Sequence, residues 1–414
     1  MNRKQFTILL LVLVIVGIAG LVVYRRENTS TGGNNPAVGK KVLPNLPYND
    51  VVTMVLKDGS SQVNLVKTNE LWRVQERNSY PANYSEISEF LLKWKDLKVV
   101  QTEEVGSADL RRLALAPDQG TNSPLVIDLK DAAGKSITTL VLGKKHMRKS
   151  NRPSQFGDMG EEGYPDGRYI TVGTGSKMVT LISDPLSNVE AKPEHWLNKE
   201  FFKIEKPRSI SVLFQNATNS WKLIRETETA EWKLGGALPE EKLDTSKVSG
   251  VSNPFSSPSF NDLIIDPSLS GSVLEKPTLV TIETFDDFTY AVKVGSKTND
   301  AYAMTLSVTA DLAKERTPGK EEKPEDKEKL DKEFKEKQKK LEEKLALEKT
   351  YENWVYLVTS WSVDSVLKER AQLMVEKKDE TKPKETGASA NTGSDKESPD
   401  DSSDPLPAAI DSDK

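Results

Sequence analysis

The sequence predicts an α+β fold: an N-terminal transmembrane helix followed by two duplicated, mainly antiparallel β-rich domains with packed helices, plus a charged helical insert. Three observations predict this fold. One long apolar run lies near the N-terminus, short segments of alternating apolar and polar residues follow it, and those segments recur in the second half of the chain.

The apolar run occupies residues 8–23 and lies between Arg3-Lys4 and Arg25-Arg26. The stretch from Phe6 to Tyr24 approaches the ~20 residues that a helix needs to cross a bilayer. A cleaved signal peptide, the alternative, has a shorter apolar stretch that ends in small residues, and Gly17-Ile18-Ala19 is a poor version of that ending. We therefore expect residues 1–26 to be a retained membrane anchor.

The charges on the two sides of the anchor are nearly balanced, so the orientation follows from the lengths of the flanks. The N-terminal flank is short, and long domains cross a membrane regardless of their charge. We expect a single-pass protein of the inner (cytoplasmic) membrane with a cytoplasmic N-terminus and an extracytoplasmic, periplasmic bulk. Residues 27–44, rich in Gly, Ser, Thr, Asn and Pro, are predicted to be a flexible spacer.

The two halves after the spacer repeat one pattern. Trp72 and Trp232 hold the same place in it, and turn residues such as Asp58-Gly59 separate the segments, as in an antiparallel meander. The repeat predicts a first domain at 45–203 and a second at 204–376. The matched segments are 51–57, 62–67 and 71–74 with 210–214, 220–225 and 231–234, then 123–129 with 276–282, 140–145 with 292–297, and 179–182 with 355–358.

One helix is predicted between the meander and the next strands of the first domain. It has a single apolar stripe, and Asn83 with Glu86 resembles a reciprocal N-terminal cap. The matching region of the second domain contains Pro254 and Pro258, so we expect a short or broken helix there. The stripe comprises Ile87, Phe90, Leu91, Trp94 and Leu97.

The larger offset at the last matched segment indicates an insertion of about two dozen residues, which we place at 314–350. In residues 320–349, 22 of 30 residues are charged, and Leu330, Phe334, Leu341 and Leu345 form a thin apolar stripe. This pattern predicts a solvated, salt-bridged helical arm. The alternative is a coiled-coil contact with a partner or a second copy of the chain. Residues 377–414 form an acidic tail that we expect to be disordered.

Composition argues against several classes of function. The net charge of −5 gives no reason to expect nucleic acid as a partner, and the absence of cysteine excludes disulfides and thiol chemistry. His146 and His195, the two histidines, have no metal-ligand spacing, so we expect no metal site. No nucleophile elbow or phosphate-binding glycine motif is present, and we expect no catalytic residue and no cofactor. Paired carboxylates such as Asp286-Asp287 could form a glycosidase pair, but a turn or a solvated face explains them better.

One segment carries a concentration of basic residues. It follows a predicted strand and leads into a glycine-rich stretch that ends near Gly167. Such a loop is a candidate surface for an anionic ligand or a protein partner, and the alternative is a flexible, solvated loop. The candidate residues are Lys144, Lys145, His146, Arg148, Lys149 and Arg152. We expect His195-Trp196 to pack the junction between the domains.

Several segments together resemble an uncharacterised bacterial family of membrane-anchored proteins, known as a domain of unknown function. The resemblance spans roughly residues 1–375 and implies one N-terminal membrane helix with duplicated β-rich domains. It also implies a gene position beside ABC transporter components of the gliding-motility auxiliary kind. The charged insert and the tail fall outside the pattern, and the family has no assigned catalytic residue. The segments are the anchor, Leu-Pro-Asn-Leu-Pro at 43–47, and residues 142–150, 165–169 and 181–186.

Two main hypotheses follow. The first is a non-enzymatic extracytoplasmic accessory protein of an ABC-type transport system, with the bilayer and the transporter subunits as partners. The second is a cell-envelope hydrolase or glycan-binding protein with a site at the domain interface. An enzyme should show a deep cleft with convergent carboxylates, whereas an interaction protein should show a shallow patch or an exposed strand edge. A weaker third possibility is self-association through 314–350.

Overall fold

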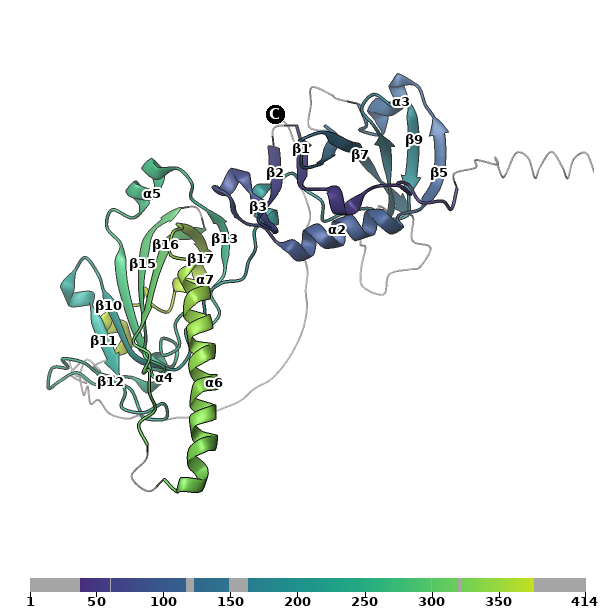
Figure 1. Cartoon of the computed structure of the whole chain (residues 1–414). Helices are drawn as coiled ribbons and strands as arrows, with labels where there is room; N and C mark the ends of the chain where they lie inside the picture. Colours follow the sequence, from purple (N-terminus) through teal and green to yellow (C-terminus); the bar gives the residue numbers. More distant parts are fainter. Residues whose placement is uncertain are drawn as a thin grey trace, which may run out of the picture. The chain divides into compact units, whose positions relative to one another are not determined.

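The computed structural model describes residues 38–59, 61–116, 123–148, 163–298, 300–318 and 322–375. It is an α+β protein with two large antiparallel sheets, which confirms the α+β, mainly antiparallel part of the predicted fold class (Figure 1). The predicted anchor at 1–26, most of the spacer and the tail at 377–414 lie outside these residues. Within the described part of the chain, no helix is long and apolar enough to span a membrane.

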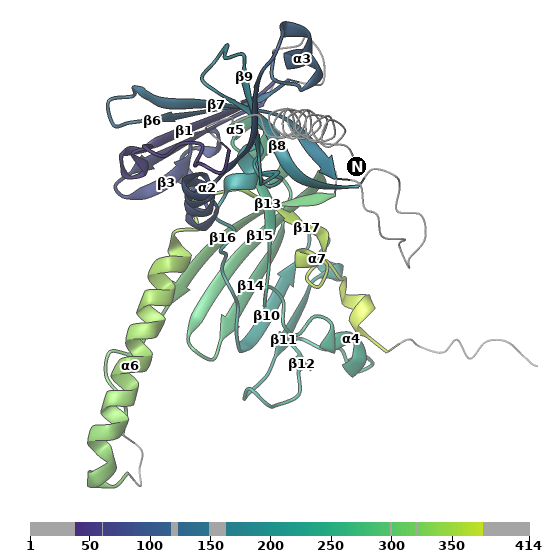
Figure 2. The same cartoon turned by 90° about the vertical axis from the view of Figure 1, so that its right-hand side faces the viewer.

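The first sheet has the strand order β4-β3-β2-β1-β6-β7-β8-β9-β5. Helix α2 (Tyr84–Asp96) lies along it (Figure 1), and α3 (Ser107–Arg112), which follows β5, lies near β9 (Figure 2). The strands are β1 (Thr53–Asp58), β2 (Ser61–Thr68), β3 (Leu71–Val74), β4 (Tyr80–Pro81), β5 (Val99–Glu104), β6 (Leu125–Lys130), β7 (Ser136–Arg148), β8 (Tyr164–Val172) and β9 (Met178–Ile182).

The second sheet has the order β12-β11-β10-β14-β15-β16-β17-β13. Its strands are β10 (Pro207–Leu213), β11 (Trp221–Ile224), β12 (Lys233–Leu234), β13 (Phe260–Leu263), β14 (Thr278–Thr284), β15 (Phe288–Thr298), β16 (Ala301–Ala310) and β17 (Tyr356–Thr359). Its helices are α4 (Thr245–Ser249), α5 (Pro267–Val273), α6 (Pro324–Lys349) and α7 (Ser360–Val363). Short 3-10 helices occupy Tyr48–Asp50, Gln75–Arg77, Pro193–Trp196, Ala217–Asn219 and Arg370–Leu373.

Apart from β4, the two sheets have the same strand order. They also share their irregularities, because the register shifts between Leu142 and Lys145 in β7 and between Val294 and Lys297 in β15. A second shared shift lies at the start of the edge strands β5 and β13. Positions in one sheet can therefore be matched to positions in the other through strand pairing.

Helix α2 confirms the predicted helix and the Asn83 half of its cap. The reciprocal half is wrong, because the Asn83 N–H donates to the carbonyl of Trp196 and the Glu86 carboxylate lies beside His195. The Asn83 side chain accepts hydrogen bonds from the backbone N–H groups of Ser85 and Glu86, which would otherwise lack partners. The helix buries Ile87, Phe90 and Trp94 against the first sheet. In the second half the corresponding helix α4 is only five residues long, as the two prolines predict.

Helix α6 confirms that the charged insert is helical, and it changes two details of the prediction. Leu341, Leu345 and the buried Glu348 of its C-terminal half pack against the second half of the protein, so this part is not a solvated arm. The insertion is also longer than two dozen residues. The connection between β15 and β16 is much shorter than the connection between β7 and β8. The offset between matched segments is the insertion minus this deletion, so it underestimates the length of the insertion.

Candidate anion-binding site

The basic segment begins within strand β7 and not, as predicted, in a loop after it. Strand β7 continues to Arg148 because its pairing with β8 resumes after the bulge, with Lys145 opposite Arg168 and Arg148 opposite Tyr164. Of the predicted candidates, Lys149 and Arg152 lie outside the described residues.

The structure separates the remaining candidates into two groups. His146 and Arg148 share Asp166, whose carboxylate lies 2.6 Å from His146 Nδ1 and 3.9 Å from Arg148 Nη1. The His146 ring also contacts the Tyr169 ring, with 5.9 Å between the centroids. These two side chains therefore belong to the outer part of the hairpin, and Lys145 beside them is partly buried.

Lys144, by contrast, lines a pocket of about 280 Å³ with three cations that the sequence reasoning missed, Arg111, Arg112 and Arg168. Among the residues that the structure describes, Asp58 is the one carboxylate in its lining, and Ser123 contributes a hydroxyl. We call this site the basic pocket and define it by the four cations Arg111, Arg112, Lys144 and Arg168.

A close backbone contact brings these residues together. The chain leaving α3 crosses β7 at Gly143, where an added Cβ would lie 2.3 Å from the carbonyl oxygen of Leu113. Only glycine fits such an approach. The Lys144 N–H also donates to this oxygen at 2.8 Å. The crossing therefore holds the last turn of α3, with Arg111 and Arg112, beside the strand that bears Lys144.

Arg168 provides the innermost positive charge. Its Nε donates to the carbonyl of Gly143 at 2.9 Å and its Nη1 to the carbonyl of Leu186 at 3.2 Å. Desolvation lowers the pKa of the guanidinium, which the charge of Asp58 opposes, but an arginine in a protein keeps its proton. No carboxylate in the described part of the chain forms an ion pair with it.

The positive charge of the pocket is only partly neutralised. Arg112 pairs with Asp109 at 3.1 Å. Within the described ranges, Lys144 and Arg111 have no ion-pair partner. A concave site with four cations and one carboxylate is suited to an anionic group, because guanidinium and ammonium donors form charge-assisted hydrogen bonds to carboxylates and phosphates.

The second half has the same framework without these charges. There, Gly295 lies against the carbonyl oxygen of Val273 at the end of α5, 2.2 Å from an added Cβ. Strand pairing matches Arg168 to Tyr302, because Lys145 pairs with Arg168 as Lys297 pairs with Tyr302. The residues matched to Arg111, Arg112, Lys144 and Arg168 are thus Gly271, Ser272, Ser296 and Tyr302. The scaffold does not require the four cations, and a comparison of the two halves could have identified them.

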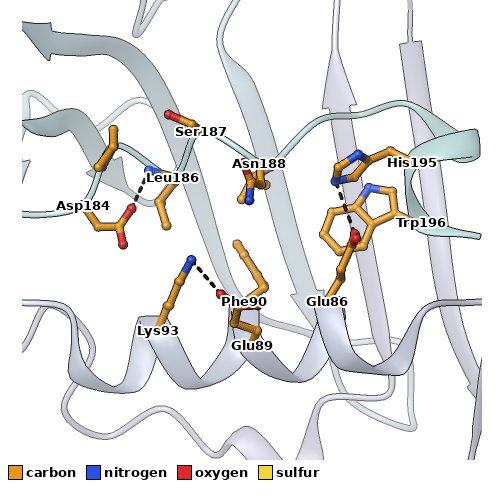
Figure 3. A pocket seen from close by; sticks show the side chains of 12 residues that line it. Glu86, Glu89, Phe90, Lys93, Asp184, Leu186, Ser187, Asn188, His195 and Trp196 are labelled. Carbon is orange, nitrogen blue, oxygen red and sulfur yellow. Dashed lines mark hydrogen bonds and ion pairs between the residues drawn. The ribbon is translucent and has the colours of Figure 1, made fainter. Parts of the chain in front are cut away.

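Another pocket lies between α2 and the segment after β9 (Figure 3). Its carboxylates do not converge on a common point. Asp184 accepts the N–H of Leu186 at 2.7 Å, and Glu89 pairs with Lys93 at 2.9 Å. Glu86 Oε2 lies 3.3 Å from Nε2 of His195 (Figure 3). These contacts join α2 to the chain that covers it.

Trp196, next to His195, is buried in the first half. Its ring lies edge-on to Phe90 of α2, with 6.5 Å between the centroids, and its Nε1 donates to the carbonyl of Glu190 at 2.8 Å. Among the described residues, no group of three or more His, Asp or Glu side chains is placed to hold a metal ion.

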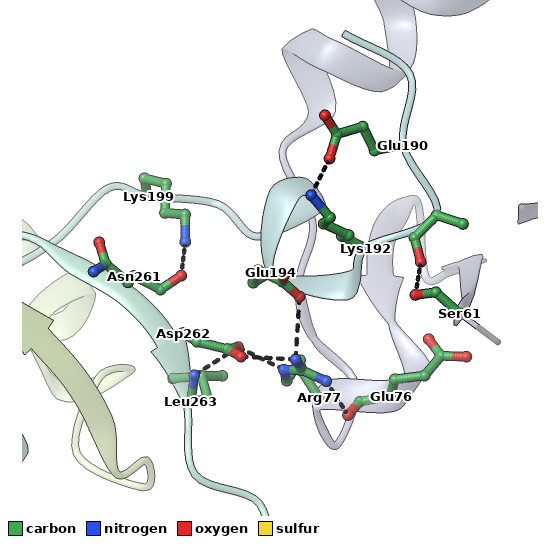
Figure 4. Close-up of polar contacts among 11 residues, drawn as sticks. Ser61, Glu76, Arg77, Glu190, Lys192, Glu194, Lys199, Asn261, Asp262 and Leu263 are labelled. Atoms are coloured by element: carbon green, nitrogen blue, oxygen red, sulfur yellow. Dashed lines mark hydrogen bonds and ion pairs between the residues drawn. The ribbon is translucent and has the colours of Figure 1, made fainter. Parts of the chain in front are cut away.

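Contacts between the two halves were the predicted place for an enzymatic or glycan-binding site. Arg77 donates to both oxygens of Asp262 at 2.5 and 2.7 Å and lies 3.3 Å from Glu194 (Figure 4). Next to them the Tyr80 ring meets Trp354 edge-on, with 4.9 Å between the centroids. These side chains at the contact are therefore ion-paired or packed.

The chain matches no protein-family model, and neither the curated proteins nor the solved structures include a significant match.

Proposed function

We propose that this protein is a non-enzymatic, membrane-anchored extracytoplasmic interaction protein whose basic pocket receives an anionic group of its partner. The observation that carries the proposal is that the four cations occur in only one of two halves with the same framework. Since the second half folds without them, folding of the framework does not account for the four cations. An anionic ligand would account for them.

The size and the chemistry of the pocket define the ligand. A pocket of about 280 Å³ is at the lower limit for small-molecule sites and has room for one carboxylate or phosphate group with its immediate neighbours. Arg168, which is held by two carbonyl oxygens, presents a fixed guanidinium. Lys144 and Arg111 can close on the ligand from the rim.

The cellular setting of the proposal comes from the sequence. The apolar stretch between Phe6 and Tyr24 would anchor the protein in the inner membrane, and the repeated framework is what a duplication of one domain would produce. The family resemblance supports an accessory role beside ABC transporter subunits. The side chains of His146 and Arg148 on the outer hairpin would extend the contact around the pocket.

The test is a pull-down of the full-length protein from its native membrane in mild detergent, read by mass spectrometry. The test variant changes Arg111, Arg112 and Lys144 to Ser, which removes charge at exposed positions. The matched control changes three exposed lysines of the second half, Lys222, Lys276 and Lys293, to Ser.

We expect transporter subunits with the wild type and the control, and at least a tenfold loss with the test variant. Equal recovery with the test variant would contradict a role of the pocket. Recovery of no partner by the wild type would contradict the accessory function itself and favour the enzymatic or glycan-binding alternative.

A further inference from the structure

The first described residues of the chain are held along the edge of the first sheet. The Gly39 N–H donates to the carbonyl of Val99 at 2.8 Å, and the Val99 N–H donates to the carbonyl of Lys40 at 3.0 Å. The Val42 N–H donates to Leu97 in the same way. These bonds hold the segment that begins at residue 38 against the start of β5 and the end of α2.

Four lysines surround this contact. Lys40, Lys95 and Lys98 are exposed, and Lys41 forms an ion pair with Asp96 at 3.0 Å. The pKa of Asp96 is lowered, first by its hydrogen bond and charge interaction with Lys41 and further by the charges of Lys95 and Lys98, which agrees with the clustering of the amines.

Two apolar side chains lie among the lysines. Val38 is 52% exposed and Val100 is 46% exposed. We call the group formed by Val38, Lys40, Lys41, Lys95, Lys98 and Val100 the proximal surface. Exposed apolar residues beside several lysines are the combination by which proteins contact the headgroup region of an anionic bilayer.

We propose that the proximal surface docks onto anionic lipid headgroups of the bilayer that holds the anchor. The argument rests on the proposed retained anchor and on where the described chain begins. The apolar run ends at Val23, and the 14 residues between it and Val38 span at most about 50 Å when fully extended. The proximal surface is the described part of the protein nearest to the anchor along the chain, and its charge is complementary to phosphate headgroups.

Docking of this kind gives the exported part of the protein a second attachment to the bilayer, in addition to the anchor. A transmembrane helix alone leaves the exported part free to rotate and tilt at the end of its spacer. A contact between lysines and headgroups restricts that motion, and it operates only within a Debye length, about 8 Å at physiological salt. The docked surface would set which sides of the two sheets face away from the membrane.

The absence of cysteine from the chain makes a direct test possible, because one introduced cysteine can be labelled alone. The full-length protein with Val100→Cys, carrying an environment-sensitive fluorophore, is reconstituted into vesicles that contain a headgroup spin-labelled lipid. Vesicles of phosphatidylcholine alone are compared with vesicles that also contain phosphatidylglycerol. Leu279→Cys, an exposed apolar position on the second sheet, is the matched label control.

We expect about twofold stronger quenching at position 100 than at position 279 in the anionic vesicles, lost in neutral vesicles or at high salt. Changing Lys40, Lys95 and Lys98 to Ser should abolish the difference, whereas changing Lys222, Lys276 and Lys293 to Ser should not. Circular dichroism of each variant verifies that the protein is folded.

Two results would overturn the inference, and they have different consequences. If the protein resists alkaline carbonate extraction and the two labels are quenched equally in anionic vesicles, the proximal surface does not dock and the anchor stands. If carbonate releases the protein, the retained anchor is wrong and the docking proposal fails with it.

Discussion

The first and second halves of this protein share a framework and differ in what the framework carries. Both place a glycine at a bulge, with a helix end crossing it, and both bury alternate residues of the central strands. In the first half the crossing brings cations together, whereas the matched positions of the second half are uncharged. The comparison indicates that packing determines the scaffold and that the residues at the helix ends and connections determine what the surface binds.

The connections differ as strongly as the charges. Strands β7 and β8 are joined through residues 149–163, whereas β15 and β16 are separated by only two residues. The second half instead has its long connection between β16 and β17, which contains α6. Each half thus has one enlarged connection, and the two enlarged connections join different pairs of matched strands.

The largest expected effect tests whether the two crossings are equivalent. Gly143→Ala and Gly295→Ala should each lower the free energy of unfolding by about 3 kcal/mol, because the new Cβ meets a backbone carbonyl that cannot move without shifting a helix end. Urea denaturation measures this. Gly271→Ala is the control, with open space around it inside α5, and should raise stability by about 0.5 kcal/mol. A lower free energy of unfolding in only one of the two variants, Gly143→Ala or Gly295→Ala, would show that the crossings are not equivalent.

The next effect tests how strongly the halves depend on each other. Arg77→Ala leaves Asp262 and Glu194 without their partner in a partly buried site and should cost about 2 kcal/mol. We expect calorimetry to resolve two unfolding transitions in the variant and one in the wild type. A double-mutant cycle with Asp262→Ala isolates the pair. A coupling energy near zero would mean that the aromatic contacts at Tyr80 hold the halves together without this pair.

The third effect tests the difference in charge directly, with inorganic phosphate as the probe. Lys144→Ser introduces the residue found at the matched position 296 and should weaken phosphate binding about tenfold, or about 1.4 kcal/mol. Isothermal titration calorimetry at low ionic strength measures it. The reciprocal Ser296→Lys variant should gain no binding, because Tyr302 replaces the arginine there. Unchanged phosphate affinity in Lys144→Ser would remove Lys144 from the site.

The smallest effects depend on pH and contrast two glutamates of the second half. Arg370 donates to Glu241 and, with the N–H of Leu238, lowers the pKa of Glu241 from 4.5 to about 2. This stabilisation is present above the unfolded value of 4.5 and is lost as the pH falls toward 2. Glu241→Gln should therefore cost about 1 kcal/mol at pH 7, a value reduced for solvent screening, and almost nothing near pH 2 in urea titrations.

Glu348 should show the opposite sign. Desolvation raises its pKa, against the opposing hydrogen bonds from Tyr290 and the N–H of Lys203. The folded protein then binds the proton more tightly than the unfolded chain, so stability falls as the pH rises above about 4.5. The stability of Glu348→Gln relative to wild type should increase from pH 4.5 to pH 7. A difference that stays constant with pH would contradict this assignment.

Local sequence patterns determined a large part of the architecture. Alternation of apolar and polar residues identified the strands of the matched segments. The match of residues 179–182 to 355–358 agrees with the pairing, in which Thr180 lies opposite Ile170 as Tyr356 lies opposite Met304. The periodic stripe and the Asn83 cap determined α2, and the charged, thinly striped pattern of the insert determined α6. These features are visible in sequence because they depend on residues within a few positions of one another.

Only the tertiary structure decided which distant residues meet. Arg111 and Arg112 reach Lys144 because α3 ends across Gly143, and Arg168 joins them through the pairing of β8 with β7. Arg77 finds Asp262 across 185 positions of the chain. From the sequence we placed the basic segment in a loop, because no local pattern shows that β7 continues to Arg148. Its continuation depends on pairing with β8, which lies later in the chain. Side-chain periodicity specifies which face of an element is buried, but the partner of that face depends on the packing of the whole chain.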